Sequence, residues 1–570
     1  MSQVAVLETN RIAIPADFPV TWPRPGDAER FWAQDRLHYP DPVTPLEFSM
    51  IEDAVDAGIT AAARSYGVPL TVLDRHINSY LYVAITEDEL SDAAAAALES
   101  ETKLRTAMAQ MEANWSGQWL PEIESHLAFW QVFDLSAASQ AELLAHLSAS
   151  WPRLQRVWKI HFLLFLPSML AISQFADLYA ELWEDAGSLE AYTLLGGFAS
   201  KTIESAEDLW TLSRQALASP ALSQLLMQTE PDAALAALAA SAQGRAFLVK
   251  LDGYLQKHGY RGDKLSLHYP FWVEEPTPVL KNLLDYMAQP GRDFGAERAR
   301  MATQREGNVA HARRHLQYYP RPVREEFDFL LGAAQAGMRL KEDHGYWIDY
   351  KTSYYVRQIF LECGRRLVAA ELLRAVDDIF YLSLAELKTV LGQTDPSHNG
   401  NARAARFQKT WQLSIDERKR VAERFAAIAP PHHLGTLPAG APPDDPISRM
   451  FLKIEGDGPG VSEDANELRG SAGAPGVVRG PVKILRVLGD AVKLQPGDIL
   501  VAESTAPPWT PLFASVAGVI TDSGGALSHS AVIAREYGIP AVVGVGTATR
   551  RLTDGQMVEI NGYLGIVRIG

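Results

Sequence analysis

Apolar side chains in residues 87–230 recur at intervals of three and four, the spacing of one face of a helix. Pro220 and Pro231 interrupt this pattern, and the residues that begin at Pro231 have the composition of a helix start. Before it, residues 70–85 are rich in β-branched and aromatic side chains, which favour strands. The first part of the chain therefore predicts a small sheet followed by a mainly helical body.

Residues 322–373 predict two further long helices that separate near Gly345. Residues 378–382 have the composition of a short strand. Ser383 then stands at the position of a helix N-cap, and Glu386 three residues later completes the pattern of a capping box. We expect a helix to begin directly after Ser383.

The last hundred residues show a different pattern, in which short apolar runs alternate with turns. They predict strands at residues 482–486, 499–502, 516–520, 541–544, 557–560 and 564–569, with at most three helices. Residues 429–460, which precede them, are rich in proline and glycine and suit either a surface loop or a hinge. A flexible chain of about 32 residues reaches roughly 30 Å, and an ordered segment at residues 447–454 would shorten this reach.

Composition narrows the classes of function. The 570 residues are 47% hydrophobic and 21% charged, as in ordinary globular proteins. The net charge of −16 and the lack of a basic run argue against nucleic-acid binding. The single cysteine, Cys363, forms no internal disulfide, and no signal pattern or uncharged run of membrane-spanning length stands out. We therefore expect a cytoplasmic protein without a membrane partner.

His529 is the strongest candidate for chemistry. A short apolar strand runs into a glycine pair, and a helix starts almost at once with this histidine in its first turn. Backbone N–H groups at a helix start are unpaired and attract anions. A neutral imidazole there could accept a phosphoryl group, although most single histidines are structural.

Residues 524–536, followed by residues 538–544, resemble the phosphohistidine signature of phosphoenolpyruvate synthase and pyruvate phosphate dikinase. The flanking residues 507–513 and 552–555 resemble the same mobile domain in rifampicin phosphotransferases and in the phosphohistidine subunit of phenylphosphate synthase. The resemblance implies a swivelling β/β/α domain whose His529 becomes phosphorylated. It also implies phosphate contacts from Thr521, Gly524, Gly525, Ser528 and Arg535. Arg535 lies nearly two turns further along the helix and could instead pair with a structural neighbour.

The larger N-terminal part resembles, more weakly, the helical substrate domain of these phosphotransferases. The similarity is carried by residues 39–46, 259–263 with 270–274, 341–349, and 377–382. Rifampicin phosphotransferases have basic residues where this chain has Glu342-Asp343-His344, which argues against a rifamycin substrate.

The resemblance makes residues 342–344 the candidate acceptor site, with His344 as general base and Glu342 and Asp343 beside it. Asp343 or Asp349 could instead be the base or a Mg²⁺ ligand, and a solvated polar turn remains the simple alternative. Arg261 could bind the transferred phosphoryl group, or form a surface ion pair with Asp263. An aromatic-lined pocket would be formed by Trp272, Tyr346, Trp347 and Tyr350, although aromatic residues are more often core. Asp349 joins Trp272, Tyr346 and Trp347 as a substrate-binding candidate.

These patterns predict an α/β multidomain protein. Residues 1–428 form a mainly helical acceptor-substrate domain, residues 429–467 a hinge linker, and residues 468–570 the swivelling phosphohistidine domain. No ATP-grasp domain is recognisable, so we expect a separate ATP-grasp subunit to supply the β-phosphoryl group of ATP, with Mg²⁺ bound by that partner. No organic prosthetic group is expected.

The predicted reaction passes the phosphoryl group from His529 to a small hydroxylated substrate, preferably a phenol or alkylphenol. Two alternatives remain open. A phosphoenolpyruvate-linked phosphotransferase would usually carry a barrel after the histidine domain, and the chain ends at Gly570. A non-catalytic phosphohistidine carrier would need no acceptor pocket, and a His344 buried away from any cleft would favour it.

Overall fold

A computed structural model gives the arrangement of the chain. It describes residues 10–87 and 93–184, residues 187–393 apart from 263, 290 and 292, residues 401–456 apart from 439 and 441–443, and residues 460–570 apart from 461 and 463. The Asp263 partner considered for Arg261 lies outside these residues.

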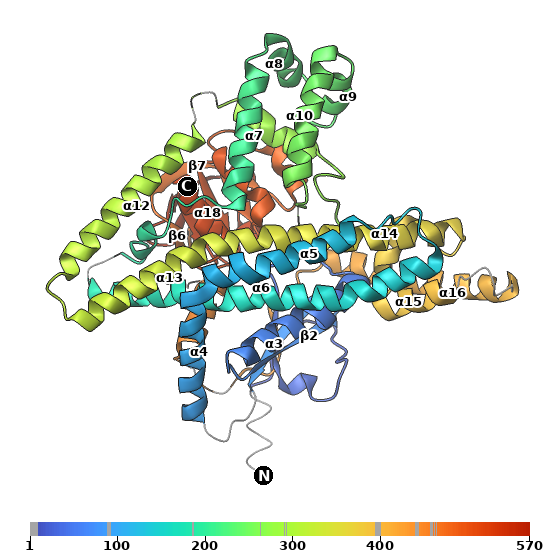
Figure 1. The fold of residues 1–570 in the computed structure, drawn as a ribbon, viewed down its shortest axis with the longest axis horizontal. Helices are drawn as coiled ribbons and strands as arrows, with labels where there is room; N and C mark the ends of the chain where they lie inside the picture. The colour runs from blue at the N-terminus through green and yellow to red at the C-terminus, as the bar shows by residue number, and fades with distance from the viewer. Residues whose placement is uncertain are drawn as a thin grey trace.

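Two long helices form the centre of the large domain. Helix α6 (Gln140–Leu182) and helix α13 (Arg321–Gly345) run side by side across the molecule (Figure 1). Helix α6 begins with a capping box, in which Ser139 Oγ accepts from the Glu142 N–H and Glu142 Oε2 accepts from the Ser139 N–H. By length and composition α6 could cross a membrane, but 61% of its apolar window is buried inside the protein. In this fold α6 is a core helix.

The helical path does not break at Gly345 as predicted. Helix α13 passes into a π-helical turn, η5 (Tyr346–Thr352), and then into α14 (Ser353–Ala369), with Gly345 and Tyr346 both in right-handed helical conformation. A π-helical turn re-aims side chains without ending a helix, and such turns are frequent at functional sites. It places residues 346–352 next to the end of α13.

The predicted strand region at residues 70–85 is confirmed. It forms β2 (Leu70–Ile77) and β3 (Tyr80–Glu87), joined at Asn78 and Ser79, which both have positive φ. The sheet is antiparallel in the order β2-β3-β1-β4, with β1 at Phe31–Gln34 and β4 at His433–Gly435. Strand β4 belongs to the segment predicted as a hinge, so part of that segment is built into the large domain.

The prediction of a strand at residues 378–382 is wrong. The chain forms a 3-10 helix, η6 (Val376–Tyr381), because Asp378 Oδ2 accepts from the N–H groups of Arg374 and Ala375, each at 3.1 Å, and closes a turn. The capping box after it is confirmed, since Ser383 and Glu386 exchange hydrogen bonds at the start of α15 (Leu384–Gln393).

The predicted helical character of residues 87–230 is confirmed in its described part. Four helices project from the α6–α13 layer in Figure 1: α7 (Lys201–Leu217), α8 (Pro220–Met227), α9 (Ala234–Ala239) and α10 (Ala242–His258). The other α-helices of this domain are α2 (Pro45–Met50), α3 (Ala57–Ser65), α4 (Ala93–Asn114), α5 (Leu120–Gln131), α11 (Thr277–Met287), α12 (Phe294–Leu316) and α16 (Asn401–Ala426).

The C-terminal domain is built on one eight-stranded sheet in the order β5-β12-β11-β7-β8-β9-β10-β6. Strands β7 to β10 are parallel, and the outer strands are antiparallel. The bounds are β5 (Glu467–Arg469), β6 (Ser471–Ala474), β7 (Val477–Ile484), β8 (Ile499–Ala502), β9 (Gly518–Thr521), β10 (Ala541–Val543), β11 (Met557–Asn561) and β12 (Ile566–Ile569). The six predicted strands are present; β5 and β6 escaped prediction because they are short and contain glycine and charge. Two α-helices, α18 (His529–Tyr537) and α19 (Ala548–Arg551), and two 3-10 helices, η7 (Leu488–Lys493) and η8 (Pro507–Ala514), complete its described part.

An ordered helix, α17 (Pro446–Glu455), precedes this domain, as the possibility of order at residues 447–454 anticipated. Its Lys453 Nζ donates to Asp177 Oδ1 at 2.6 Å and to Ser173 O at 3.0 Å, both on α6. The segment between the domains is therefore fastened to the helical body over much of its length.

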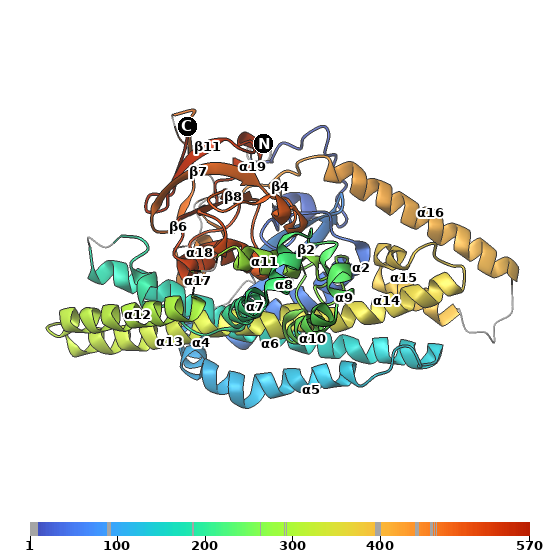
Figure 2. The ribbon, with the colours of Figure 1, turned by 90° about the horizontal axis from the view of Figure 1, so that it is seen from above.

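The C-terminal domain sits on one side of the α6–α13 layer, and α5 lies on the other (Figure 2). One apolar cluster includes side chains from both domains, among them Trp272 and Phe294 of the large domain with Phe513 and Tyr537 of the C-terminal domain. The Phe294 and Tyr537 rings are 5.9 Å apart. The two domains are thus packed together in this arrangement, with α18 facing α13.

Candidate phosphotransfer site

His529 lies where the two domains meet. Strand β9 ends at Thr521, and Ser528 caps α18 by accepting from the Ala531 N–H, so His529 is the first helical residue. Its side chain is 11% exposed. Nε2 lies 3.3 Å from Thr510 Oγ1, and Nδ1 lies 3.9 Å from Glu342 Oε1 of α13 without a hydrogen-bond partner among the described residues.

The imidazole of His529 is held neutral. Burial is the largest cause and, with the smaller effects of the Lys341 and Arg261 charges, lowers its pKa to about 4 against the opposing effect of the Glu342 carboxylate. A neutral ring keeps a free lone pair near pH 7, which a nucleophile toward phosphorus needs. The ring is therefore in the protonation state that can accept a phosphoryl group.

The glycine pair before the helix has a packing role. Gly524 has a φ of +98°, which disfavours other residues. A Cβ on Gly525 would lie 2.4 Å from the Lys453 carbonyl oxygen, because Gly525 and Leu527 donate to the carbonyls of Ile454 and Lys453 at 2.8 Å each. The glycines let the end of α17 bond directly to residues 522–528, the phosphohistidine loop of the prediction, and this contact was not part of the predicted phosphate cradle.

Arg535 is the structural residue that the alternative interpretation described. Its Nη1 donates to the Gly473 carbonyl at 2.7 Å and its Nη2 to the Ala526 carbonyl at 2.8 Å, and it stacks over Tyr192 of the large domain. Burial lowers its pKa to about 10. Thr521 Oγ1 likewise donates to the Ser523 carbonyl at 2.8 Å. In this arrangement these two predicted phosphate ligands shape the loop instead.

The side chains of the predicted acceptor motif, Glu342, Asp343 and His344, point in three different directions. Glu342 faces His529, whereas Asp343 Oδ1 accepts from the Lys201 N–H at 2.8 Å and so helps to cap α7. His344 turns into the helical body, where its Nδ1 donates to the Leu340 carbonyl at 3.1 Å and its ring lies 4.4 Å from that of His161. By position, Glu342 faces His529, whereas His344, the predicted base, is buried in the helical body, which is the arrangement said above to favour the non-catalytic carrier.

Glu342 is an ionised carboxylate in a buried position. Burial raises its pKa, whereas the Lys341 charge, a 2.9 Å hydrogen bond from Thr202 Oγ1 and, when that ring is protonated, the charge of His529 lower it, and the net direction is downward. Lys341 Nζ donates to the Leu527 carbonyl of the phosphohistidine loop at 3.1 Å. Lys341 therefore contacts the phosphohistidine loop, and the neighbouring Glu342 faces the His529 ring.

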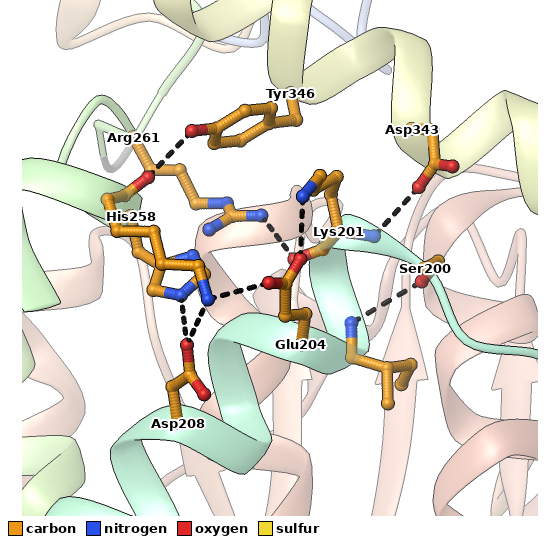
Figure 3. A network of polar contacts seen from close by, with 10 residues as sticks. Ser200, Lys201, Glu204, Asp208, His258, Arg261, Asp343 and Tyr346 are labelled. Carbon is orange, nitrogen blue, oxygen red and sulfur yellow. Dashed lines mark hydrogen bonds and ion pairs between the residues drawn. The ribbon is translucent and has the colours of Figure 1, made fainter. Parts of the chain in front are cut away.

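Arg261 lies within electrostatic reach of His529 and is 2% exposed. Its Nη2 donates to the Lys201 carbonyl at 3.0 Å, and its guanidinium lies 5.5 Å from the Tyr346 ring centre (Figure 3). Nη1 is buried and has no partner in the described part of the chain. A buried guanidinium N–H without a partner, within electrostatic reach of His529, is suited to an oxyanion.

A charged network holds Arg261 in place (Figure 3). Lys201 and Lys257 both pair with Glu204, at 2.7 and 2.6 Å, and Lys257 also pairs with Asp208 at 2.7 Å. His258 Nε2 lies 2.8 Å from the same Asp208 oxygen, and Tyr346 Oη donates to the Lys257 carbonyl at 2.7 Å. These contacts join the ends of α7, α10 and α13 and fix the segment that carries Arg261.

Of the predicted pocket residues, Asp349 and Tyr346 lie near the site and Trp272 does not. Trp272 is buried in the apolar cluster shared with the C-terminal domain, and Trp347 is half-buried beneath Lys351. Asp349 Oδ1 bonds His161 Nδ1 on α6 at 2.8 Å. Sequence analysis missed His161, because nothing in an apolar stretch of α6 marks it apart from the histidine itself.

Tyr350 is a further residue of this interior. Its hydroxyl is buried and unpartnered among the described residues, and burial together with the Asp349 charge raises its pKa well above the ordinary value. Arg261 and Glu342 also act on it electrostatically. Buried polar atoms of Tyr350, Arg261, His344 and His529 thus have no hydrogen-bond partner among the described residues.

A neutral imidazole at a helix start, which faces a carboxylate across a domain boundary and lies within electrostatic reach of a buried guanidinium, defines a candidate phosphotransfer site. Comparison with known families agrees with this class. Residues 494–565 match the family described as PEP-utilising enzyme, mobile domain, and residues 161–342 match the rifampicin phosphotransferase fourth domain. The matches support a PEP-utilising, dikinase-type family for this chain. The expected α/β multidomain fold class is confirmed.

Three relatives show the range of sequence identity and coverage. The chain is 40% identical to chondramide synthase of Chondromyces crocatus over 99% of its own length and 14% of that protein. It is 26% identical to an uncharacterized phosphotransferase of Bacillus subtilis, covering 95% of this chain and 62% of the relative. It is 30% identical to rifampicin phosphotransferase of Streptomyces sviceus, covering 61% of this chain and 37% of the relative. The chain thus spans less than two thirds of the length of each of these relatives.

Proposed function

We propose that this chain is the phosphohistidine and acceptor part of a dikinase-type phosphotransferase. In this proposal His529 receives the β-phosphoryl group of ATP from an ATP-grasp module that lies outside these 570 residues, on a separate subunit, and Mg²⁺ binds with the nucleotide there. The observation that supports it is the contact between domains: the neutral His529 ring faces Glu342 at 3.9 Å, within reach of the buried Arg261 charge.

The transfer step breaks the N–P bond of phosphorylated His529 and forms an O–P bond to the acceptor hydroxyl. The acceptor loses a proton, which we assign to Glu342, because it is the ionised carboxylate next to the ring. Phosphoryl transfer has a loose transition state, so a carboxylate of modest basicity suffices, as in protein kinases. Arg261 Nη1 would stabilise the negative charge on the phosphoryl oxygens.

The docked arrangement corresponds to the acceptor half of the cycle. His529 is enclosed by the large domain, so a nucleotide-binding module can reach it only after the C-terminal domain has moved away. The glycine-rich stretch around α17 would supply that movement once the α17 contacts to α6 and to the loop open. Each half-reaction would then proceed in its own dry pocket.

The acceptor we favour is a small phenol or alkylphenol. A phenolic hydroxyl has a pKa near 10 and is easier to deprotonate than an alkyl alcohol. Aromatic side chains accompany the site, with Tyr346 under Arg261 and Tyr350 behind Glu342, and they suit a flat aromatic ring. The sequence resemblance to phenylphosphate synthase agrees with this choice.

The two half-reactions can be separated. With ³²P-labelled phenyl phosphate as a reverse substrate, the wild-type chain should become labelled at His529 without any ATP-grasp protein. Glu342→Gln should lower this labelling about a hundredfold or more while leaving labelling from ATP and the ATP-grasp partner intact. Glu325→Gln, an exposed change on the same helix, is the matched control. Equal loss of both half-reactions in Glu342→Gln would contradict the assigned role.

A further inference from the structure

Behind Glu342, on the side of α13 that faces α6, three potential metal ligands meet. His161 comes from α6, His344 from the end of α13 and Asp349 from the π-helical turn η5. One ligand atom from each lies within 4.8 Å of the others. The π-helical turn is what brings Asp349 back to the face of His344, five residues earlier.

The hydrogen bonds of His344 leave one nitrogen available. Its Nδ1–H donates to the Leu340 carbonyl at 3.1 Å, which places the lone pair on Nε2. Nε2 is buried, the residue is 3% exposed, and no described group bonds this atom. Histidine ligands of metals are commonly oriented in this way, by donating the other ring N–H to a carbonyl or carboxylate.

The pair formed by His161 and Asp349 has the spacing of two ligands of one ion. His161 Nδ1 and Asp349 Oδ1 lie 2.8 Å apart. Two ligands each about 2.1 Å from a metal and at right angles to each other are separated by roughly 3 Å. A cation could therefore replace the shared proton of this pair with small movements of the side chains.

We propose that His161, His344 and Asp349 bind a divalent transition-metal ion. Two imidazoles and one carboxylate suit Zn²⁺, Mn²⁺ or Co²⁺, whereas Mg²⁺ prefers oxygen ligands. Trp158, Phe162 and Phe165 surround the His161 ring and keep the site dry, which strengthens metal–ligand interactions.

Three protein ligands leave a coordination position for water. Residues two apart on a helix do not share a face, and His344 points into the helical body whereas Glu342 faces His529, so an ion at this site would hold α6, α13 and η5 together. The proposal of metal binding does not rest on the proposed function.

The test uses the full chain, stripped with a chelator and titrated with Co²⁺ and Zn²⁺. We expect one ion per chain by elemental analysis and a Co²⁺ absorption spectrum typical of nitrogen and oxygen ligands. His344→Ala and Asp349→Asn should each weaken binding at least tenfold. His146→Ala is the matched control, because His146 also lies on α6, has a buried unpartnered Nε2, and stacks on Phe129 and Phe133. Circular dichroism checks that each variant is folded.

Two results would overturn the proposal: a folded wild-type chain that binds neither ion at micromolar concentration, or binding that survives unchanged in both His344→Ala and Asp349→Asn. The first would leave His161 and Asp349 as a hydrogen-bonded pair that acts without metal. Labelling of His529 in the same preparations reports on the proposed function separately, because the metal ligands are not part of the phosphohistidine loop.

Discussion

The two sides of the phosphotransfer site are built differently. On the C-terminal side, one continuous stretch supplies β9, the glycine pair, the cap and His529. On the other side, the groups come from α7, the segment after α10, and α13, and the outermost two, Thr202 and Glu342, are 140 residues apart along the chain. The first side is a local motif, and the second exists only when the helical domain is folded. The chemistry of the ring is therefore encoded locally, while its acceptor environment is assembled.

The largest expected effect comes from Arg261. Arg261→Gln removes the charge beside His529 and should slow transfer to the acceptor by about a hundred- to a thousandfold, as does the loss of an oxyanion-stabilising donor. Labelling of His529 from ATP should change little, because that step uses the undocked C-terminal domain. Arg313→Gln, an exposed change on α12, is the control. Radiolabelled half-reactions measure both steps, and parallel loss of both would show that the two sides are not separable.

A substantial loss of stability is expected from Arg535. Arg535→Met leaves the Gly473 and Ala526 carbonyls without their charged donor and should lower the free energy of unfolding by about 2–3 kcal/mol. Arg535→Lys should fall between this variant and the wild type. Chemical denaturation measures the loss. A variant that is stable but cannot be phosphorylated would instead assign Arg535 to the phosphate.

The third expected effect is that the docking of the C-terminal domain on the large domain depends on pH. The pKa of His529 is about 4 when the ring is buried and returns toward 6.5 when it is exposed, so the docked form binds fewer protons. Docking should therefore be fully favoured above about pH 6.5 and lost as the pH falls toward 4, by about tenfold at pH 5.5.

Energy transfer between dyes at Val249→Cys and Tyr563→Cys would follow this docking, since both positions are exposed and Cys363 is buried. Burial and the Arg36 and Arg550 charges also lower the pKa of His432 to about 4, so this residue could contribute to the same pH dependence. Comparing wild type with His529→Gln gives the part of the pH dependence that comes from His529. Docking that strengthens at low pH would contradict the expected direction.

The smallest effect is expected from Asp343. Asp343→Ala removes the carboxylate that accepts from the Lys201 N–H at the start of α7 and should cost about 1 kcal/mol of stability, as for other helix caps. Transfer should fall only slightly, and thermal unfolding measures the stability. If Asp343→Ala slowed phosphoryl transfer to the acceptor as much as Arg261→Gln does, Asp343 would take part in the acceptor chemistry, as the sequence analysis predicted.

The contrast between the two sides also explains what the sequence could predict. Six of the eight strands of the C-terminal domain and the helix start at His529 follow from short-range patterns, and they overlap the residues that the patterns predicted. The directions of Glu342, Asp343 and His344 depend on the π-helical turn and on the packing of α6 against α13, which no local pattern contains. His161 became visible only through its contact with Asp349, 188 residues away.

The most direct measurement is labelling of the chain with β-³²P-ATP in the presence of an ATP-grasp protein, comparing wild type with His529→Ala. We predict an acid-labile label on the wild-type chain, absent without the partner and absent from His529→Ala, and released as labelled product when a phenol is added. Undiminished label on His529→Ala would show that His529 is not the residue that carries the phosphoryl group.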